Sequence, residues 1–355
     1  MTEFFKRLLH ARGRKKQAAR NFYVKKTQTL MRIDSRPTTE INYLLKNRFQ
    51  TQVISRSTLA GASETCFVTK DGMFRHNFNV AEIVTLNSAI VDTEFNHVYA
   101  ITNRGAPVLL QESSDWPSST ITQFHRIASS ISKVTLANVS LGLGSRGFYH
   151  MVVEDLSRII SLDKSNRILQ YAQSSGKSFE ILAAMSFEVI SVPKFVRVEN
   201  FTFVTHGNDL GYLNSWQLNA LRENFKDLKM APSGEKLYIS RSFTRRSPSF
   251  EAGLMEKLRN SGFRIVHLEE MRFEDQVRLL SSAEVIVGVH GAGLTGSLWA
   301  HQPLVIELME ENYFNRCFEW QTLMNNGKYE RIFYTAKSTD ADVIFDQILT
   351  KLNAI

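Results

Sequence analysis

The last third of the chain has the clearest pattern of hydrophobic and polar positions. Short apolar runs rich in Val, Ile and Leu alternate there with longer segments whose apolar residues recur every three or four positions. The short runs predict buried strands, and the longer segments predict amphipathic helices. Because such alternation needs right-handed crossovers, we expect a parallel sheet with helices on both faces. The predicted strands are 237–240, 263–268, 284–289, 304–308 and 331–334, and the predicted helices are 249–260, 273–282, 293–300, 313–324 and 341–352.

The earlier part of the chain predicts a second set of elements. Short runs of β-forming residues recur between turn signals from about residue 64 to 125, which favours strands that are partly antiparallel. Residues 33–60 show no clear pattern. The chain therefore belongs to the α/β class, with an additional β-rich segment in its N-terminal half. Alternation resumes after residue 130, with strands predicted at 134–141, 167–172, 188–192 and 201–205 and a helix at 149–162.

Length and composition indicate two globular domains. The chain has 355 residues, of which 43% are hydrophobic and 22% are charged, and a single core rarely serves that length. Two cysteines, Cys66 and Cys317, are too few for a disulfide framework, and no Cys/His cluster suggests a metal. We expect an N-terminal domain at 33–225 and a C-terminal domain at 226–355, with the last helix packing on either of them.

The positive charge is concentrated in an arm at residues 1–32. This arm holds ten Lys and Arg residues against one acid, Glu3, so it carries +9 in a chain whose net charge is +8. We favour an amphipathic helix on an anionic membrane surface over a solvated tail and over nucleic-acid binding, which the nearly neutral body of the chain disfavours. The apolar face of that helix would consist of Phe4, Phe5, Leu8 and Leu9.

The hydropathy of the chain predicts its location. No apolar run approaches the roughly 20 residues that span a bilayer. Lys6 and Arg7 interrupt the apolar residues near the start, so the sequence shows no signal peptide. We expect a cytoplasmic bacterial protein that is peripheral at the inner face of the inner membrane.

Glycines follow the most apolar predicted strand. Residues 284–289 run directly into His290-Gly291-Ala292-Gly293 and a helix. Ligands of open parallel sheets bind at such strand ends, glycines let the backbone approach them, and free N–H groups at a helix start attract phosphate. The alternative is that these glycines only allow tight packing between strand and helix.

Polar residues at two other strand ends favour a shared ligand site. An arginine there can offset diphosphate charge, and a carboxylate can accept two hydrogen bonds from ribose hydroxyls. The alternatives are a solvated loop for the arginines and an internal salt bridge for the carboxylate. These residues are Ser240, Arg241, Arg245 and Arg246 after the strand 237–240, and Glu307 in the strand 304–308.

Several segments resemble glycosyltransferase family 61 in their order and spacing, over roughly residues 130–335. The most specific is His290-Gly291-Ala292-Gly293-Leu294-Thr295. Phe148-Tyr149-His150, with Glu154, Asp155 and Arg158, is similar to the N-terminal motif of the family. The chain departs from many members at Gly296, where they carry Asn, and in a shorter segment at 299–303. The remaining matching segments are 236–241, 269–270, 273–277 and 305–308.

The resemblance implies a GT-B fold, in which two Rossmann-like domains face each other across a cleft. Family members are inverting transferases without a divalent metal, so we expect no metal and no cofactor besides a nucleotide-sugar donor. The transferred sugar, whether hexosyl, pentosyl or N-acetylhexosaminyl, stays open. Asp340 and Asp342 are interpreted as capping the last helix. The donor would contact Ser240, Arg241, Arg246, His290, Gly291, Ala292, Gly293, Leu294, Thr295 and Glu307, and the acceptor would be a glycan or lipid-linked glycan of a surface polysaccharide or capsule.

Inverting transfer needs a base for the acceptor hydroxyl. We predict His150, whose unperturbed pKa lies near working pH, with Glu154 one helical turn later as the alternative base. Asp155 could orient either residue. The other interpretation of His150 is a residue that positions substrate or caps its helix.

Two rival hypotheses concern other classes of protein. A GT-B protein without catalysis would only bind nucleotide sugar or glycan, and donor hydrolysis would distinguish it from an enzyme. A nicotinamide-dependent oxidoreductase is disfavoured because no Gly-x-Gly-x-x-Gly opens a βαβ unit with an acidic residue about 20 positions after its last glycine.

Overall fold

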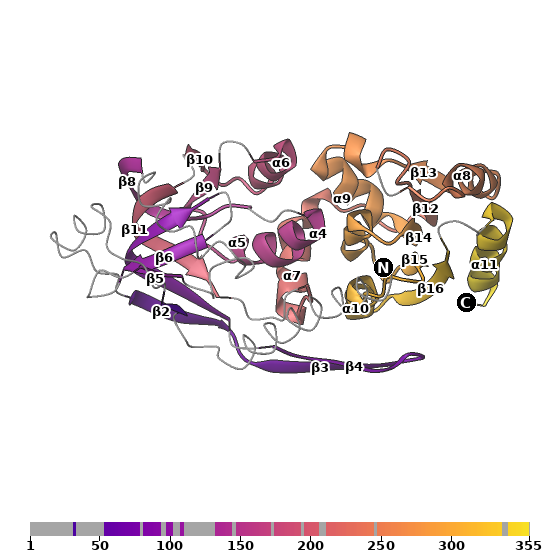
Figure 1. The fold of residues 1–355 in the computed structure, drawn as a ribbon, viewed down its shortest axis with the longest axis horizontal. Coiled ribbons are helices and arrows are strands. Elements are labelled where there is room, and N and C mark those ends of the chain that lie inside the picture. Colours follow the sequence, from indigo (N-terminus) through magenta and orange to yellow (C-terminus); the bar gives the residue numbers. More distant parts are fainter. Residues whose placement is uncertain are drawn as a thin grey trace, which may run out of the picture.

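The protein is described here by a computed structural model, which has a mixed α/β fold (Figure 1). The predicted arm lies outside the described residues except for Met31–Arg32, which forms the edge strand β1. Arg245 and Arg246 also lie outside them. The described residues are 31–32, 53–78, 81–93, 97–101, 107–109, 132–143, 147–171, 174–192, 195–205, 211–244, 247–335 and 340–354.

The C-terminal half forms the predicted parallel sheet, with the strand order β13-β12-β14-β15-β16. The apolar runs explain its position, because all but one residue of β14 are buried, as expected of a strand covered on both faces. The strands are β12 (Glu235–Ile239), β13 (Arg264–Val266), β14 (Ala283–Val289), β15 (Leu304–Glu310) and β16 (Lys328–Tyr334).

Helices cover both faces of this sheet, as predicted. Two of them, α8 (Glu251–Asn260) and α11 (Ala341–Asn353), pack together on one face, so the last helix lies with the C-terminal sheet. The other face carries α9 (Phe273–Ser281), the 3₁₀ helix η6 (Ala292–Leu298) and α10 (Cys317–Met324). The chain therefore changes face between β12 and β14, and the carboxyl ends of these neighbouring strands form a topological switch point.

Helix boundaries differ from the prediction at two places. The segment after β14 is a 3₁₀ helix, in which the Leu294 N–H donates to the Gly291 carbonyl. Helix α10 begins at Cys317 and not at residue 313. At its first residue, the Cys317 N–H donates a hydrogen bond to the Asn315 side chain. At the last helix the capping prediction is confirmed, because the Asp340 side chain accepts from the Asp342 N–H.

The N-terminal sheet is mixed. Its strands β8, β9, β10 and β11 run parallel, whereas β1, β2, β5, β6 and β7 pair antiparallel, as expected for the early strands. The twelve-residue strand β5 joins the two parts by pairing with β11. The bounds are β2 (Val53–Ala60), β5 (Ala81–Asp92), β6 (His97–Ile101), β7 (Pro107–Leu109), β8 (Ser132–Leu141), β9 (Arg167–Tyr171), β10 (Val189–Val192) and β11 (Phe195–Val204).

Helices lie between the two sheets (Figure 1). Their apolar side chains join those of α9, η6 and α10 in one continuous core, so the two halves share buried surface. In particular α4 contacts η6, and α6 contacts α9. These helices are α4 (Phe148–His150), the π-helix η3 (Met151–Leu156), α5 (Ser157–Ile159), α6 (Gly176–Ala184), α7 (Ser215–Asn224) and the short 3₁₀ turn η4 (Lys226–Leu228).

A two-stranded hairpin leaves the N-terminal half and runs beneath the helices toward the C-terminal sheet (Figure 1). It consists of β3 (Ser63–Thr69) and β4 (Gly72–Phe78), and its inner face packs on the buried Trp320 of α10. Phe67 and Phe74 meet the Trp320 ring edge-on, with centroids at 5.1 and 4.9 Å. Across the described part of the chain, we find no helix with the length and apolar character to cross a membrane.

Candidate active site

The switch point between β12 and β14 brings together two of the predicted donor-site segments. Arg241 follows β12, and His290 follows β14. The Arg241 guanidinium donates a hydrogen bond from Nη1 to the His290 carbonyl at 2.5 Å. Both residues are partly exposed, so Arg241 and His290 lie together at the open end of the sheet.

Gly291 makes this approach of Arg241 sterically feasible. A Cβ at position 291 would lie 2.5 Å from Arg241 Nη1 and 2.9 Å from its Cζ. The backbone of Gly291 is extended, so the glycine is needed for space and not for an unusual φ. The close approach that was predicted for these glycines therefore occurs, with an arginine of this chain as the neighbouring group.

A buried carboxylate holds the His290 ring. Glu307 is fully buried and forms hydrogen bonds with both oxygens, accepting from His290 Nδ1 at Oε1 and from the Tyr329 hydroxyl at Oε2. The His290 ring also lies against Tyr313 and Phe318, with centroids at 4.8 and 5.2 Å. Glu307, which we expected to accept hydrogen bonds from ribose hydroxyls, thus faces the His290 imidazole. Its contact with ribose stays a prediction.

Glu251 is a site residue that the sequence analysis missed. It lies at the start of α8, is 1% exposed, and accepts from the Arg241 N–H at 2.6 Å and from the Ser240 hydroxyl at 3.2 Å. The Tyr238 hydroxyl at 3.3 Å and the Ser247 hydroxyl complete its surroundings. Glu251 therefore fixes the turn that carries Arg241. An acidic residue ten positions after an arginine gives no sequence signal, because only the fold closes this loop.

The rest of the glycine-rich segment divides into a surface part and a core part. Ala292 is exposed and Gly293 is partly exposed, whereas Leu294 and Thr295 are fully buried. Gly296, the departure from the family, packs against α9, and a Cβ there would lie 2.2 Å from Leu280 Cδ1. A ligand at this loop would thus meet residues 290–293, while Leu294 and Thr295 anchor the loop in the core.

His150 forms a second pair of imidazole and buried carboxylate. His150 Nδ1 lies 2.8 Å from Glu154 Oε1, and the side chain of His150 is 37% exposed while that of Glu154 is 0% exposed. The hydrogen bond to Glu154 raises the pKa of His150 above its usual 6.5, against the lowering effect of burial. The predicted helical proximity of the two residues is confirmed, although Glu154 lies in a π-helical turn, a feature frequent at functional sites.

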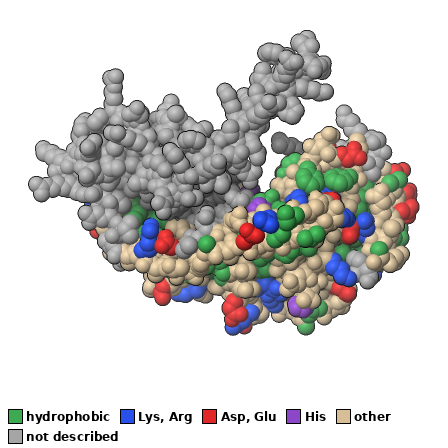
Figure 2. Space-filling model, turned by 90° about the horizontal axis from the view of Figure 1, so that it is seen from below, with side chains coloured by type: hydrophobic (Ala, Val, Ile, Leu, Met, Phe, Trp, Pro, Cys, Tyr) green, Lys and Arg blue, Asp and Glu red, His purple; other side chains and the backbone are tan. Residues whose placement is uncertain are grey.

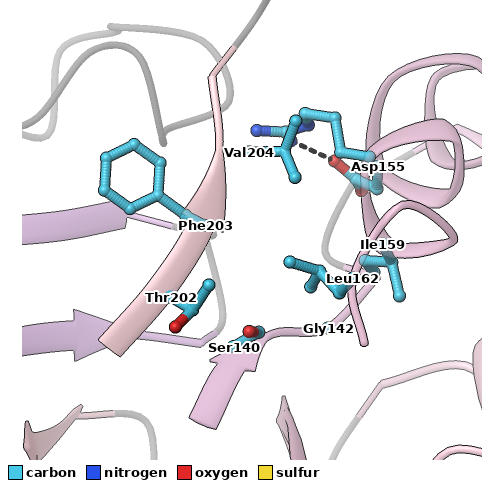
Figure 3. Close-up of a pocket in the computed structure, with 9 residues that line it drawn as sticks. Ser140, Gly142, Asp155, Ile159, Leu162, Thr202, Phe203 and Val204 are labelled. Atoms are coloured by element: carbon cyan, nitrogen blue, oxygen red, sulfur yellow. Dashed lines mark hydrogen bonds and ion pairs between the residues drawn. The ribbon is translucent and has the colours of Figure 1, made fainter. Parts of the chain in front are cut away.

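Asp155 forms a pair with Arg158 on the same stretch of helix. Its Oδ1 accepts a hydrogen bond from Arg158 Nη2 at 3.0 Å, and both residues line a cavity between the helix and the N-terminal sheet (Figure 3). With a volume of about 20 Å³, the cavity is large enough for a water molecule and too small for a sugar. Asp155 thus stabilises the helix that carries His150.

The two imidazoles belong to segments that pack together. Helix α4 contacts η6. The Tyr149 ring packs edge-on against the Phe318 ring, with centroids at 5.1 Å, and the Phe318 ring also lies against the His290 ring. The Tyr149 hydroxyl donates to the Gly211 carbonyl at 2.6 Å, which fixes this aromatic bridge. The N-terminal and C-terminal motifs, which are about 140 residues apart, therefore meet in space.

Comparison with known families points in the same direction. Residues 148–306 match the family described as Glycosyltransferase 61. The matched span begins at Phe148 of α4 and ends in β15, so it includes His150, Arg241 and the loop at 290–295. No curated protein matches the chain. The match supports glycosyltransferase family 61 and, with it, a glycosyltransferase activity.

Proposed function

We propose that the protein is an inverting glycosyltransferase that moves a sugar from a nucleotide sugar to a hydroxyl of a glycan or glycolipid, without a metal ion. The observation that carries the proposal is the meeting of Arg241 and His290 at the switch point of a parallel sheet. Ligands of such sheets bind in the crevice just outside the carboxyl ends of the strands at this point. The match to glycosyltransferase family 61 selects the reaction among the many that this kind of sheet supports.

The donor end of the reaction needs positive charge for the departing diphosphate. Arg241 supplies a permanent cation at the partly exposed end of β12. His290 adds an imidazole whose Nδ1–H donates to Glu307, so Nε2 is left as an acceptor for a hydroxyl of the sugar nucleotide. A preorganised donor such as Arg241 stabilises developing charge without reorganisation, and loss of one such donor typically costs roughly 100- to 1000-fold in rate.

The acceptor end needs a base on the opposite side of the sugar. His150 fits this role because Glu154 holds Nδ1 and thereby directs Nε2 outward as the proton acceptor. The raised pKa makes the neutral imidazole a stronger base than an unperturbed histidine. The acceptor hydroxyl would lose its proton to Nε2 while its oxygen attacks the anomeric carbon and the nucleoside diphosphate leaves toward Arg241.

This division of roles corresponds to a GT-B arrangement. The donor groups extend from the C-terminal sheet, and the base lies on a helix packed against the N-terminal sheet. In this proposal the arm at residues 1–32 holds the enzyme at the inner face of a bacterial inner membrane, near a lipid-linked acceptor of surface polysaccharide synthesis. The charge asymmetry of the sequence supports that location.

A binding experiment tests the donor site first. Ligand-observed NMR of the full chain against a panel of nucleotide sugars should show saturation transfer to one nucleotide sugar, unchanged by EDTA. Arg241→Ala should abolish this signal, whereas Arg259→Ala on the exposed side of α8 is the matched control. Absence of binding across the panel would overturn the proposal, and binding lost with EDTA would refute the metal-free mechanism.

A turnover experiment separates an enzyme from a binding protein. Hydrolysis of the bound donor in the absence of acceptor should be measurable, and His150→Ala should slow transfer while donor binding survives. Donor binding without hydrolysis or transfer to any glycan would instead support a non-catalytic nucleotide-sugar-binding protein.

A further inference from the structure

A chain of buried hydrogen bonds continues behind His290, away from the ligand side. Glu307 accepts from His290 and from the Tyr329 hydroxyl, and the same hydroxyl oxygen accepts from Arg331 Nε at 3.1 Å. Burial, together with the neighbouring Glu307, raises the pKa of Tyr329, so the phenol stays protonated and donates. Because β15 and β16 are adjacent parallel strands, Glu307 and Arg331 are register partners, which fixes this geometry in the sheet.

Arg331 connects the chain to the tip of the β3–β4 hairpin. Its Nη1 lies 2.8 Å from Asp71 Oδ2, in the turn between the two hairpin strands, 260 residues away in sequence. Its Nη2 lies 2.8 Å from Glu319 Oε2 on α10. The side chain of Arg331 is only 3% exposed, so the hairpin and α10 together supply the negative charge that a buried guanidinium requires.

Two other contacts seat the hairpin tip. Arg316 donates from Nη2 to the Thr69 hydroxyl at 2.9 Å and pairs with Glu319 through Nε at 2.8 Å. Lys70 pairs with Glu330 Oε2 at 2.6 Å, but this pair faces solvent and does not touch Tyr329. Figure 2 shows the molecule from the side of the hairpin, where charged side chains of both signs lie among hydrophobic ones. Charge pairs therefore hold the tip of the hairpin in place, while its strands pack on the aromatic cluster around Trp320.

We infer that the hairpin positions the donor-site imidazole, through the chain Asp71, Arg331, Tyr329, Glu307 and His290. The expected change in turnover rests on the proposed function, whereas the expected change in the His290 imidazole does not. With both oxygens of Glu307 engaged, the carboxylate cannot rotate, and His290 keeps its proton on Nδ1. Without the Tyr329 hydroxyl, Glu307 Oε2 has lost its donor, and the carboxylate and the ring can turn together.

The inference makes Tyr329, Arg331 and Asp71 positioning residues, none of which touches substrate. The tautomer of His290 is the decisive readout, because a residue that only adds stability would not change it. It can be measured by long-range ¹H–¹⁵N spectra of the full chain labelled at histidine, with the His290 signals assigned from His290→Gln. The wild type should show the Nδ1–H tautomer.

Tyr329→Phe removes one hydroxyl and should give a mixture of His290 tautomers. Turnover should fall about tenfold or more while the donor KM changes less than twofold, because misplacement of a reacting group by about 1 Å costs up to 100-fold in rate. Asp71→Asn, at a residue whose side chain is 37% exposed, should act in the same direction more weakly. Lys70→Met is the matched control on the same tip and should leave both the spectrum and turnover unchanged.

Three outcomes decide the matter. If Tyr329→Phe keeps the wild-type tautomer and turnover, the inference is overturned. If Tyr329→Phe misfolds, Asp71→Asn is used instead, and a wild-type tautomer and turnover in that variant would overturn the inference. Equal losses in Asp71→Asn and Lys70→Met would show that docking of the hairpin suffices, which also overturns it. A shifted tautomer in a protein that transfers no sugar would confirm the inference and refute the proposed function.

Discussion

Gly291→Ala should lower activity about 100-fold without unfolding the protein. The added Cβ would lie 2.5 Å from Arg241 Nη1, whereas ordinary contacts with a Cβ begin at about 3.4 Å. The guanidinium must therefore retreat by roughly 1 Å, since the methyl group is fixed to the backbone. The fold should tolerate the change, because residue 291 has an extended backbone and is only partly buried.

The size of the effect follows from this displacement. A retreat of about 1 Å lengthens the hydrogen bond from Arg241 to the His290 carbonyl from 2.5 Å to a distance at which it is no longer a hydrogen bond. Misplacement of a catalytic group by about 1 Å costs on the order of 100-fold in rate. That factor corresponds to about 2.7 kcal/mol of transition-state stabilisation.

The assay compares kcat/KM for donor hydrolysis or transfer with the thermal midpoint of unfolding. Gly291→Ala should lose about 100-fold in kcat/KM with little change in the midpoint, whereas Arg259→Ala, on the exposed side of α8, should change neither. Full activity in Gly291→Ala would refute the assignment of Arg241 to the leaving group. A large fall in the midpoint would instead show that Gly291 is required for packing.

Three further predictions test other parts of the site. Gly296→Ala should destabilise the protein by about 1–3 kcal/mol, because its Cβ would lie 2.2 Å from Leu280 Cδ1; unchanged denaturant unfolding would contradict this. Glu251→Ala should cost about 3 kcal/mol of stability and most of the activity, because it leaves buried donors unpaired around the Arg241 turn. Calorimetry and rate measurements together check this prediction, and normal donor turnover would show that Glu251 does not fix the Arg241 turn. Activity should rise with pH as the neutral form of His150 appears, with a midpoint above 6.5, and Glu154→Gln should move that midpoint downward because the bond that raises the pKa is lost; an unmoved profile would exclude His150 as the base. For stability the sign is opposite: the contribution of this pair is present below pH 6.5 and is lost as the pH rises through the raised pKa.

Local pattern predicted the C-terminal sheet well. The strands around Val287 and Ile306 are buried on both faces, so their sequences are continuous apolar runs, as expected of parallel strands. The convergence of Arg241 and His290 also followed from the sequence, because carboxyl ends of parallel strands meet at one edge. The π-helical turn around Glu154 could not be predicted, since it differs from an α-helix by one residue per turn and leaves the apolar pattern nearly unchanged.

The sequence predicted which residues carry the chemistry and that a parallel sheet would bring some of them together. The partner of each carboxylate is visible only in the folded chain: Glu307 holds His290, Glu154 holds His150, and Asp155 pairs with Arg158. It also connected Asp71 of the hairpin to the donor side of the molecule. The physical reason is that local propensity and strand order act over a few neighbouring residues. A buried carboxylate, in contrast, takes whichever donors the packed chain brings to it, and these can lie hundreds of residues away.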